Sequence, residues 1–278
     1  MEAPPHFEDG TVQSGGFRLS YSRLRPQASK ATLVILHGLN DHKGRYRQLQ
    51  EELAAAGYAS MAYDQRGFGR SEGRRTDVAD YHDLLDDLKT LVDLAQAEAQ
   101  EKVVVLGHSL GGAVAAAFFI ASPEAAEALV LSSPAYDFPG LPMRLELLTR
   151  LLSRIVPRVS IRYPSVGNQR SRDPTIDIAV ANDPLIFREG TPRFYREFRK
   201  MNRLVHEEAS KITAPTLILQ AGADKIVRPE GAKDLYRQLK HPKSKLIGYE
   251  GYYHEVFHDI GRGRVVSDLI AWLATVIP

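Results

Sequence analysis

Short apolar runs alternate with longer amphipathic segments along most of the chain. The runs have the length and composition of β-strands, and the amphipathic segments repeat apolar residues at helical spacing. Strands are predicted at residues 17–25, 32–36, 60–63, 103–106, 128–132, 215–221 and 245–249, and helices at 45–56, 77–100, 112–121, 229–239 and 265–277. Residues 17–25 alternate apolar with polar positions and predict an edge strand, whereas residues 32–36 predict a central one. Strands separated by helices favour a parallel sheet with right-handed crossovers.

The alternation stops between residues 137 and 205. Seven prolines divide this segment, and it contains 13 basic and 7 acidic residues, so its net charge is +6 while the rest of the chain carries −4. We predict a helical cap at 137–205 inserted into a core of residues 1–136 and 206–278, which together form a single domain. Within the cap, residues 143–156 form an amphipathic helix. This helix either packs on the body or lies at a lipid interface with its arginines toward anionic head groups.

Composition narrows the class of protein. A chain of 278 residues with 44% hydrophobic content can bury one large core. The net charge of +2 argues against a nucleic-acid binder, and the absence of cysteine excludes disulfides and thiolate catalysis. The first residues lack the basic and apolar regions of a signal peptide, so a cytoplasmic protein is expected. The longest apolar run, residues 113–121, is far shorter than the ~20 residues of a membrane span.

Residues 107–111 carry the strongest chemical signal. They read GHSLG, directly after an apolar run suited to a buried strand and directly before an alanine-rich helix. A strand, a sharp G-x-S-x-G turn and a helix form the nucleophile elbow of serine hydrolases. At such a turn Ser109 is held in a strained backbone conformation. Gly107 and Gly111 are expected because a side chain at either position would collide with the neighbouring strand or helix.

A serine hydroxyl needs an imidazole to take its proton and a carboxylate to orient the imidazole. Asp224 follows the predicted strand 215–221, and His254 follows the last predicted strand. The order Ser, Asp, His is that of the α/β-hydrolases. His258 is the alternative base. Asp137, just after the strand 128–132, is the alternative acid.

The oxyanion formed during ester cleavage needs fixed hydrogen-bond donors. We expect one from the backbone N–H of Leu110, at the start of a helix, and one from Leu39 in the loop after strand 32–36. Gly38 allows that loop to approach closely. His37 and His108 are expected to brace the site by hydrogen bonding.

Residues 254–258 also match a competing motif. They read HEVFH, and H-E-x-x-H on a helix places two zinc ligands on one face. The motif follows a strand and the sequence GYY, which favours a turn over a helix, and a zinc site leaves Ser109 and Asp224 unexplained. We therefore expect no metal. Loss of activity with a chelator, with Ser109 unlabelled by a phosphonate, would favour zinc.

Several motifs resemble the monoacylglycerol lipase and lysophospholipase group of the α/β-hydrolase superfamily. Residues 37–46, HGLNDHKGRY, are similar to H-G-x-x-E-H-x-x-R-Y, and residues 64–73, DQRGFGRSEG, are similar to D-x-R-G-x-G-x-S-x-G. The elbow, NDPL at 182–185 and YHE at 253–255 complete the set. The resemblance runs over nearly the whole chain.

The resemblance implies an α/β-hydrolase fold. We expect a mostly parallel eight-stranded sheet flanked by helices, with the helical cap inserted after the sixth strand. The family implies Ser109, Asp224 and His254 as the triad, Leu39 and Leu110 as oxyanion-hole donors, a mobile amphipathic cap as lid, and no cofactor.

The resemblance also suggests substrate contacts. Asp41 and Arg45 are expected to shape the polar end of the site near a glycerol group, although Asp41 stands where the family usually has the longer Glu. His108 is a further candidate.

These features predict a serine hydrolase that cleaves monoacylglycerols to fatty acid and glycerol through an acyl-enzyme intermediate. Lysophospholipids are the nearest rival substrates because a basic cap suits their phosphate, and a general carboxylesterase is a further alternative. A non-catalytic ligand receptor is the alternative from another class, since such proteins can keep a triad. The expected partner is the lipid ester, with no nucleic acid and no obligate protein partner. If the helix at 143–156 lies at a lipid interface, the cap also contacts a membrane surface.

Overall fold

The computed structural model describes residues 6–99, 102–137, 141–163 and 167–277. Eight strands form one sheet, in the order β1-β2-β4-β3-β5-β6-β9-β10. They are β1 (Glu8–Ser14), β2 (Phe17–Leu24), β3 (Thr32–Leu36), β4 (Ala59–Tyr63), β5 (Val103–His108), β6 (Ala128–Ser132), β9 (Thr216–Ala221) and β10 (Lys245–Tyr249). Among the described residues of this sheet, only β1 with β2 and β2 with β4 pair antiparallel. The predicted α/β-hydrolase sheet is therefore confirmed.

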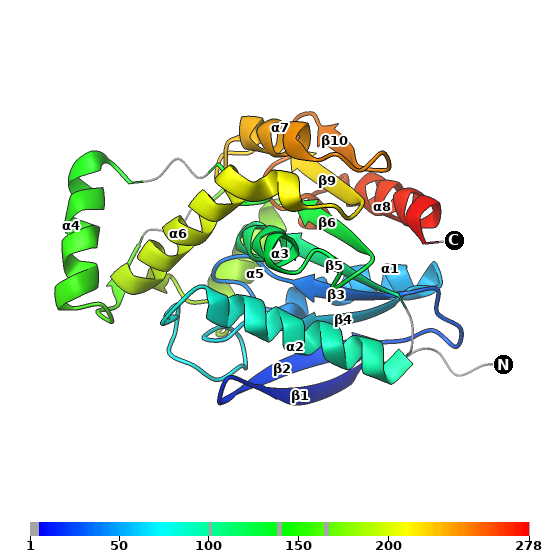
Figure 1. The fold of residues 1–278 in the computed structure, drawn as a ribbon, viewed down its shortest axis with the longest axis horizontal. Helices are drawn as coiled ribbons and strands as arrows, with labels where there is room; N and C mark the ends of the chain where they lie inside the picture. The colour runs from blue at the N-terminus through cyan, green and yellow to red at the C-terminus, as the bar shows by residue number, and fades with distance from the viewer. Residues whose placement is uncertain (1–5, 100–101, 138–140, 164–166, 278) are drawn as a thin grey trace.

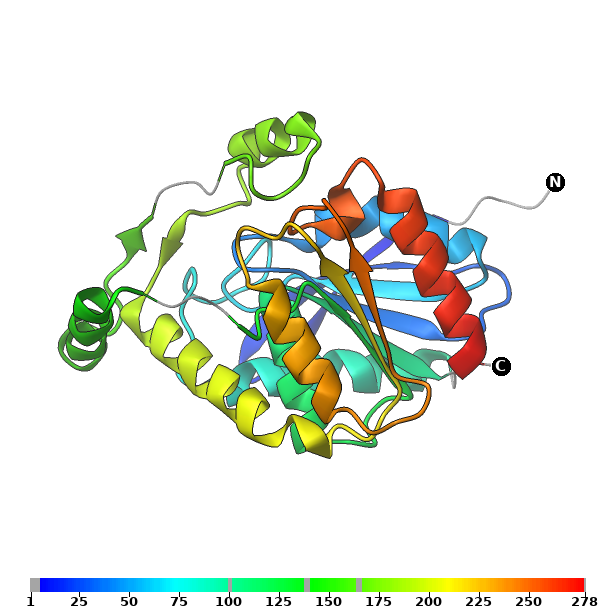
Figure 2. The ribbon, with the colours of Figure 1, turned by 90° about the horizontal axis from the view of Figure 1, so that it is seen from above.

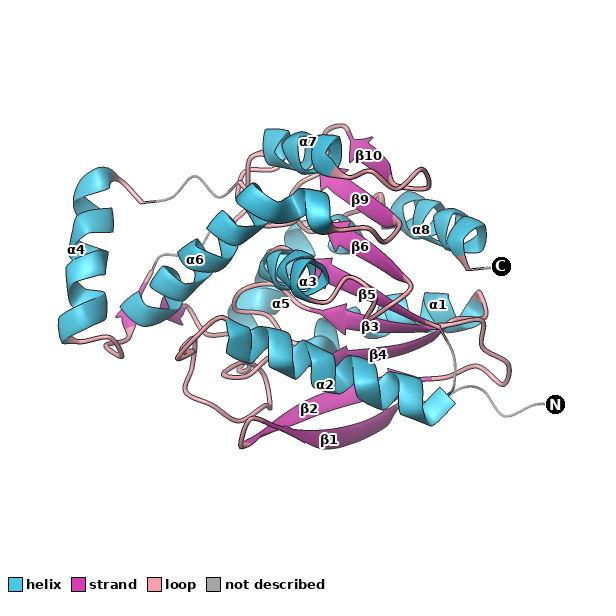
Figure 3. Ribbon diagram, viewed as in Figure 1, coloured by secondary structure: helices cyan, strands magenta, loops and turns pink. Residues whose placement is uncertain are grey.

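Helices cover both faces of this sheet (Figures 1 and 3). The helices of the described chain are α1 (Arg47–Ala55), α2 (His82–Ala99), α3 (Leu110–Ala121), α4 (Met143–Ile155), α5 (Pro174–Asn182), α6 (Pro192–Glu208), α7 (Pro229–Gln238) and α8 (Arg262–Val276). Side chains of α1 and α8 share one apolar core with the sheet, and side chains of α2, α3, α6 and α7 share the other. The sheet is thus buried on both sides, which explains its continuous apolar runs.

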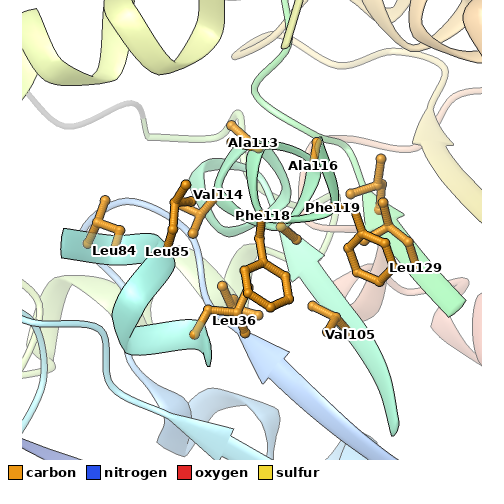
Figure 4. Packing of buried hydrophobic residues seen from close by; sticks show 14 of the residues in the cluster. Leu36, Leu84, Leu85, Val105, Ala113, Val114, Ala116, Phe118, Phe119 and Leu129 are labelled. Atoms are coloured by element: carbon orange, nitrogen blue, oxygen red, sulfur yellow. The ribbon is translucent and has the colours of Figure 1, made fainter. Parts of the chain in front are cut away.

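Helix α3 lies at the centre of one of these cores. Its side chains are buried on nearly every side of the helix. This is possible because alanine, valine and phenylalanine occur all around it. Phe118 and Phe119 point down onto the sheet, toward Leu36 of β3, Val105 of β5 and Leu129 of β6 (Figure 4). This packing fixes the start of α3, and so the turn that precedes it.

Two element predictions were wrong. Residues 17–25 are not the edge, because β1 pairs outside β2. The helix predicted from Asp77 begins at His82, and the side chain of Asp77 instead accepts a hydrogen bond from Arg193 Nε at 2.9 Å. The predicted end of this helix, Gln100, lies outside the described residues.

The segment between β6 and β9 contains α4, α5, α6 and a two-stranded ribbon of β7 (Ile161–Arg162) and β8 (Glu189–Gly190). We call residues 137–205 the insertion. Helices α5 and α6 begin where the sequence provides caps: the side chain of Asp173 accepts from Thr175 N at 2.9 Å, and that of Thr191 from Phe194 N at 3.1 Å. Helix α6 runs three residues past the predicted boundary at Val205. Within the insertion, residues 138–140 and 164–166 lie outside the described residues.

Helix α4 lies at the outer end of α6, away from the sheet (Figures 1 and 2). Ser153 is buried, whereas the large apolar side chains along the helix are mostly exposed. No helix in the described part of the chain is long and apolar enough to span a membrane.

Candidate active site

Ser109 occupies a strained turn between β5 and α3. Its φ of 53° and ψ of −114° lie far from the common conformations of a non-glycine residue. Its backbone N donates to the Ser132 carbonyl at 2.9 Å, which ties the turn to β6. A Cβ at Gly107 would collide with the carbonyl oxygen of Gly111, and one at Gly111 would lie 2.6 Å from the carbonyl oxygen of His37. Both glycines are therefore required, as predicted.

Asp224 and His254 form a buried pair. His254 Nδ1 donates to Asp224 Oδ2 at 2.7 Å, and the two side chains are 5% and 0% exposed. The other carboxylate oxygen, Oδ1, accepts from the backbone N–H groups of Ile226 at 2.9 Å and Val227 at 3.0 Å. These donors orient the carboxylate so that Oδ2 faces the imidazole. The alternative acid, Asp137, instead accepts from Arg228 Nη2 at 2.6 Å.

The topology brings these three residues to the same end of the sheet, where the parallel strands have their carboxyl ends. Ser109 follows β5, Asp224 follows β9 and His254 follows β10, and the parallel strands β5, β6, β9 and β10 are neighbours in that order. The ring of His108, which precedes Ser109, lies 4.9 Å from the ring of His254, centroid to centroid. The serine turn and the imidazole loop therefore meet.

The loop after β3 lies against Ser109. A Cβ at Gly38 would lie 3.3 Å from Ser109 Cβ, so only glycine permits this approach without displacing the serine. The ring of His37 fixes the loop, because its Nδ1 donates to the Gly38 carbonyl at 2.7 Å and its Nε2 accepts from Gln65 N at 3.0 Å. Burial lowers the pKa of His37, in keeping with this neutral tautomer. Leu39, next in the loop, is exposed.

Two further predicted residues lie beside the turn. Leu110 is the first residue of α3, where a helix leaves its backbone N–H without an intrahelical acceptor. His108 Nδ1 lies 3.1 Å from both the carbonyl and the hydroxyl oxygen of Ser132. Burial, with a contribution from nearby His254, lowers the pKa of His108 to about 3, so its ring is neutral.

Asp41 and Arg45 belong to a buried charge cluster. Arg45 Nη1 lies 3.2 Å from Asp41 Oδ1, and Arg45 Nη2 donates to Glu255 Oε2 at 2.5 Å. Tyr46 also donates to Asp41, at 3.3 Å. Burial opposes ionisation of Glu255, but the positive charge of Arg45 outweighs it and lowers the pKa of Glu255 to about 2. Arg45 thus links the loop that contains Leu39 to the residue that follows His254.

The HEVFH segment takes part in the same cluster. Only Val256–His258 form a short 3₁₀ turn, so the segment is not the helix that a zinc motif requires. His258 Nε2 donates to the Arg45 carbonyl at 2.9 Å, while His254 pairs with Asp224. Each of its polar side chains therefore has a protein partner.

The NDPL segment joins the insertion to the loop after β3. Asp183 Oδ2 lies 2.8 Å from His42 Nε2, and His42 Nδ1 accepts from Gly44 N at 3.1 Å, so the Nε2 proton is directed at Asp183. Nearby, the backbone carbonyl of Arg170 accepts from Glu255 N at 2.7 Å. The insertion therefore contacts both loops that flank Ser109.

Comparison with known proteins places the chain in a family. Residues 27–261 match the family model described as serine aminopeptidase, S33. The chain is 32% identical over 265 residues to the monoglyceride lipase of Homo sapiens, covering 90% of this chain and 86% of that one. It is 29% identical over 265 residues to the monoacylglycerol lipase of Mycolicibacterium smegmatis, covering 94% of each. The crystal structure of the Paleococcus ferrophilus monoacylglycerol lipase has a TM-score of 0.84 at 29% identity and covers 92% of this chain and 98% of that one.

The fold and the serine turn at its sheet edge define an α/β-hydrolase. Within that superfamily the chain belongs to the serine aminopeptidase S33 family, and its similarity to monoacylglycerol lipases over nearly its whole length confirms the predicted resemblance.

Proposed function

We propose that the protein is a serine esterase that hydrolyses monoacylglycerols to fatty acid and glycerol. The observation that carries the proposal is the buried Asp224–His254 pair, which lies at the sheet edge beside the strained Ser109 turn. The choice of ester is supported by the similarity of nearly the full chain to a monoacylglycerol lipase and a monoglyceride lipase.

Ser109 would attack the ester carbonyl while His254 Nε2 takes the hydroxyl proton. Asp224 balances the imidazolium charge, and its two backbone donors keep the carboxylate in place. The negative oxygen of the tetrahedral intermediate would accept from the backbone N–H groups of Leu39 and Leu110. Glycerol then leaves with the proton from His254. A water molecule, deprotonated by the same ring, cleaves the acyl-enzyme and frees the fatty acid.

The insertion would act as a lid over this site. It contacts both loops that flank Ser109, through the His42–Asp183 and Glu255–Arg170 hydrogen bonds. The acyl chain would lie under the insertion, where burial is worth ~0.8 kcal/mol per methylene. Rates should therefore rise with chain length until the space under the insertion is filled.

A substrate panel tests this function. We expect monooleoylglycerol to be cleaved faster than lysophosphatidylcholine, and monoacylglycerol rates to rise from four to twelve acyl carbons. Falling rates along that ladder would indicate a plain carboxylesterase. Faster cleavage of lysophosphatidylcholine would indicate a lysophospholipase. An aminoacyl nitroanilide tests the peptidase activity named by the family model. No turnover of any ester would favour the ligand-receptor alternative.

The Arg45 cluster gives a second prediction. We expect Glu255→Gln to lower kcat roughly 10- to 100-fold, because it removes the ion pair with Arg45, one of the links between the loop of His254 and the loop of Leu39. If Arg45 serves only this link, kcat for a monoacylglycerol and kcat for a 4-nitrophenyl ester should fall by the same factor in this variant, with KM unchanged. If the cluster instead contacts glycerol, only the monoacylglycerol should be affected, through KM.

Glu52→Gln is the matched control for that variant. Glu52 accepts from Arg262 at 2.6 Å through both carboxylate oxygens, and this pair joins α1 to α8. The control should lower the melting temperature without changing kcat. Equal losses of kcat in the two variants would mean that Glu255 affects only stability.

A further inference from the structure

Asn40 holds an unusual backbone position in the loop after β3. It directly follows Leu39 and is buried, with a φ of 53°. This left-handed conformation is uncommon outside glycine, although asparagine adopts it more readily than most residues. The ring of His37 fixes the start of the same loop, and Asp41 belongs to the Arg45 cluster. Leu39 therefore lies between fixed residues, and the contacts of Asn40 limit the directions in which the Leu39 backbone can point.

The side-chain amide of Asn40 bridges the insertion and the core. Its Nδ2 donates to the hydroxyl oxygen of Tyr163, the residue that follows β7, and its Oδ1 accepts from Thr76 Oγ1 at 3.4 Å. Burial raises the pKa of the Tyr163 hydroxyl, so this group stays protonated and neutral. The amide thus donates on one side and accepts on the other, which the side chain of an ionised aspartate could not do.

Further contacts hold both partners of the Asn40 amide in place. Thr76 is buried and has a φ of 46°, which is costly for a β-branched residue and persists only where the surroundings impose it. The Thr76 carbonyl accepts from Thr191 at the start of α6, through N at 3.3 Å and through Oγ1 at 3.0 Å. The backbone N of Tyr163 donates to the Arg188 carbonyl at 3.2 Å, which extends the pairing of β7 with β8.

The β7–β8 ribbon packs closely beside these partners. A Cβ at Gly190, in β8, would lie 3.5 Å from Cε1 of Tyr163 and 3.7 Å from Cγ2 of Thr76. The ribbon belongs to the insertion, and Tyr163 is 123 residues away from Asn40 in the chain. Displacement of the ribbon would therefore remove the acceptor of the Asn40 amide and the packing beside Thr76 together.

We propose that Asn40 is a positioning residue for the oxyanion hole and that Tyr163 of the insertion holds it in place. The Leu39 N–H would point at the oxyanion only while the ribbon is docked on the loop. Docking of the insertion and completion of the oxyanion hole would then be one event. The inference rests on the proposed function, in which Leu39 provides one of the two oxyanion-hole donors.

Two variants remove the bridge from its two ends. Tyr163→Phe deletes the acceptor, whereas Asn40→Gly deletes the amide but tolerates the positive φ. We expect either variant to lower kcat for 4-nitrophenyl butyrate about 10- to 100-fold with KM unchanged, because a misaimed donor stabilises the oxyanion less well. The double variant should lose no more than the larger single loss, since both substitutions break one contact. Losses that multiply in the double variant would overturn the proposal.

Inhibition by an alkyl trifluoromethyl ketone separates the oxyanion hole from substrate binding. Ser109 adds to the ketone carbon, His254 takes the hydroxyl proton, and the carbonyl oxygen becomes an anion that the hole stabilises. The inhibition constant should rise in each variant by about the factor by which kcat/KM falls. An unchanged inhibition constant beside a lowered kcat would overturn the proposal.

Tyr249→Phe is the matched control. The hydroxyl of this buried tyrosine donates to Asp268 Oδ2 at 3.0 Å and so joins β10 to α8. The control should lower the melting temperature without changing the inhibition constant. An equal rise in the control and in Tyr163→Phe would mean a general loss of stability and would overturn the proposal.

The wild-type protein provides the test that separates this inference from the proposed function. A wild-type protein that neither cleaves an ester nor binds the ketone would overturn the proposed function, and this inference with it. An active wild-type enzyme whose Asn40→Gly and Tyr163→Phe variants keep the full kcat would overturn this inference alone.

Discussion

Replacing Ser109 by alanine is expected to lower kcat for monooleoylglycerol roughly 10⁶-fold, because the substitution removes the only group that can form the acyl-enzyme in the proposed reaction. The turn itself should survive. The backbone N of Ser109 donates to Ser132, and its carbonyl accepts from Ala113 at 3.1 Å, and neither bond needs the side chain. The variant should therefore keep its melting temperature and its affinity for substrate.

Ser122→Ala is the matched control. Ser122 ends the helix that Ser109 begins, and its backbone N donates to the Phe118 carbonyl at 2.8 Å. Its substitution should leave kcat unchanged. If the Ser109 variant retained more than about one per cent of the wild-type rate, another group would be the nucleophile.

Replacing Asp224 by asparagine is expected to lower kcat about 10⁴-fold. The reason lies in the contacts of the carboxylate. The N–H groups of Ile226 and Val227 donate to Oδ1, so they would select the amide oxygen of asparagine at that position. The amide NH₂ would then face His254 Nδ1, where the ring now donates at 2.7 Å. Two donors cannot share one hydrogen bond, so the imidazole would move its proton to Nε2 and lose its ability to act as base.

Steady-state kinetics of the Asp224→Asn and Asp137→Asn variants tests whether Asp224 is the acid that orients His254. Asp137→Asn is the control, because Asp137 was the alternative acid and its carboxylate accepts from Arg228 on the surface. It should retain nearly the full kcat. A large loss for Asp137→Asn with a small one for Asp224→Asn would exchange the roles of the two carboxylates.

Most of the sheet could be predicted because its central strands are buried on both faces. Their apolar runs at β3, β5, β6 and β9 stand out from the amphipathic helices between them. Strand β1 could not be predicted in the same way. It forms the edge of the sheet, and its seven residues, EDGTVQS, are mostly exposed or half-buried, so they show little apolar pattern.

The start of α2 was misplaced for a tertiary reason. Asp77 looks like a helix start, but Arg193 and Thr191 of the insertion bind its carboxylate. Those partners lie more than a hundred residues away, and only the fold brings them together.

In the candidate site, too, some features could be predicted from the local sequence and others depend on contacts between distant residues. The positions of Ser109, Asp224 and His254 follow from strand ends and chain order, whereas their catalytic roles remain predictions. The contact of Arg45 with Glu255 spans 210 residues, and no local spacing indicates it. The sequence suggested a glycerol contact for Asp41 and Arg45, which the substrate comparison with Glu255→Gln now tests.

The central claim is that His254 activates Ser109 for attack. Its most direct measurement is the rate at which a fluorophosphonate labels the protein, followed by peptide mapping of the labelled residue. The account predicts a single label on Ser109, formed at least a hundredfold more slowly in a His254→Ala variant. A label on another residue, or equal labelling rates with and without His254, would contradict it.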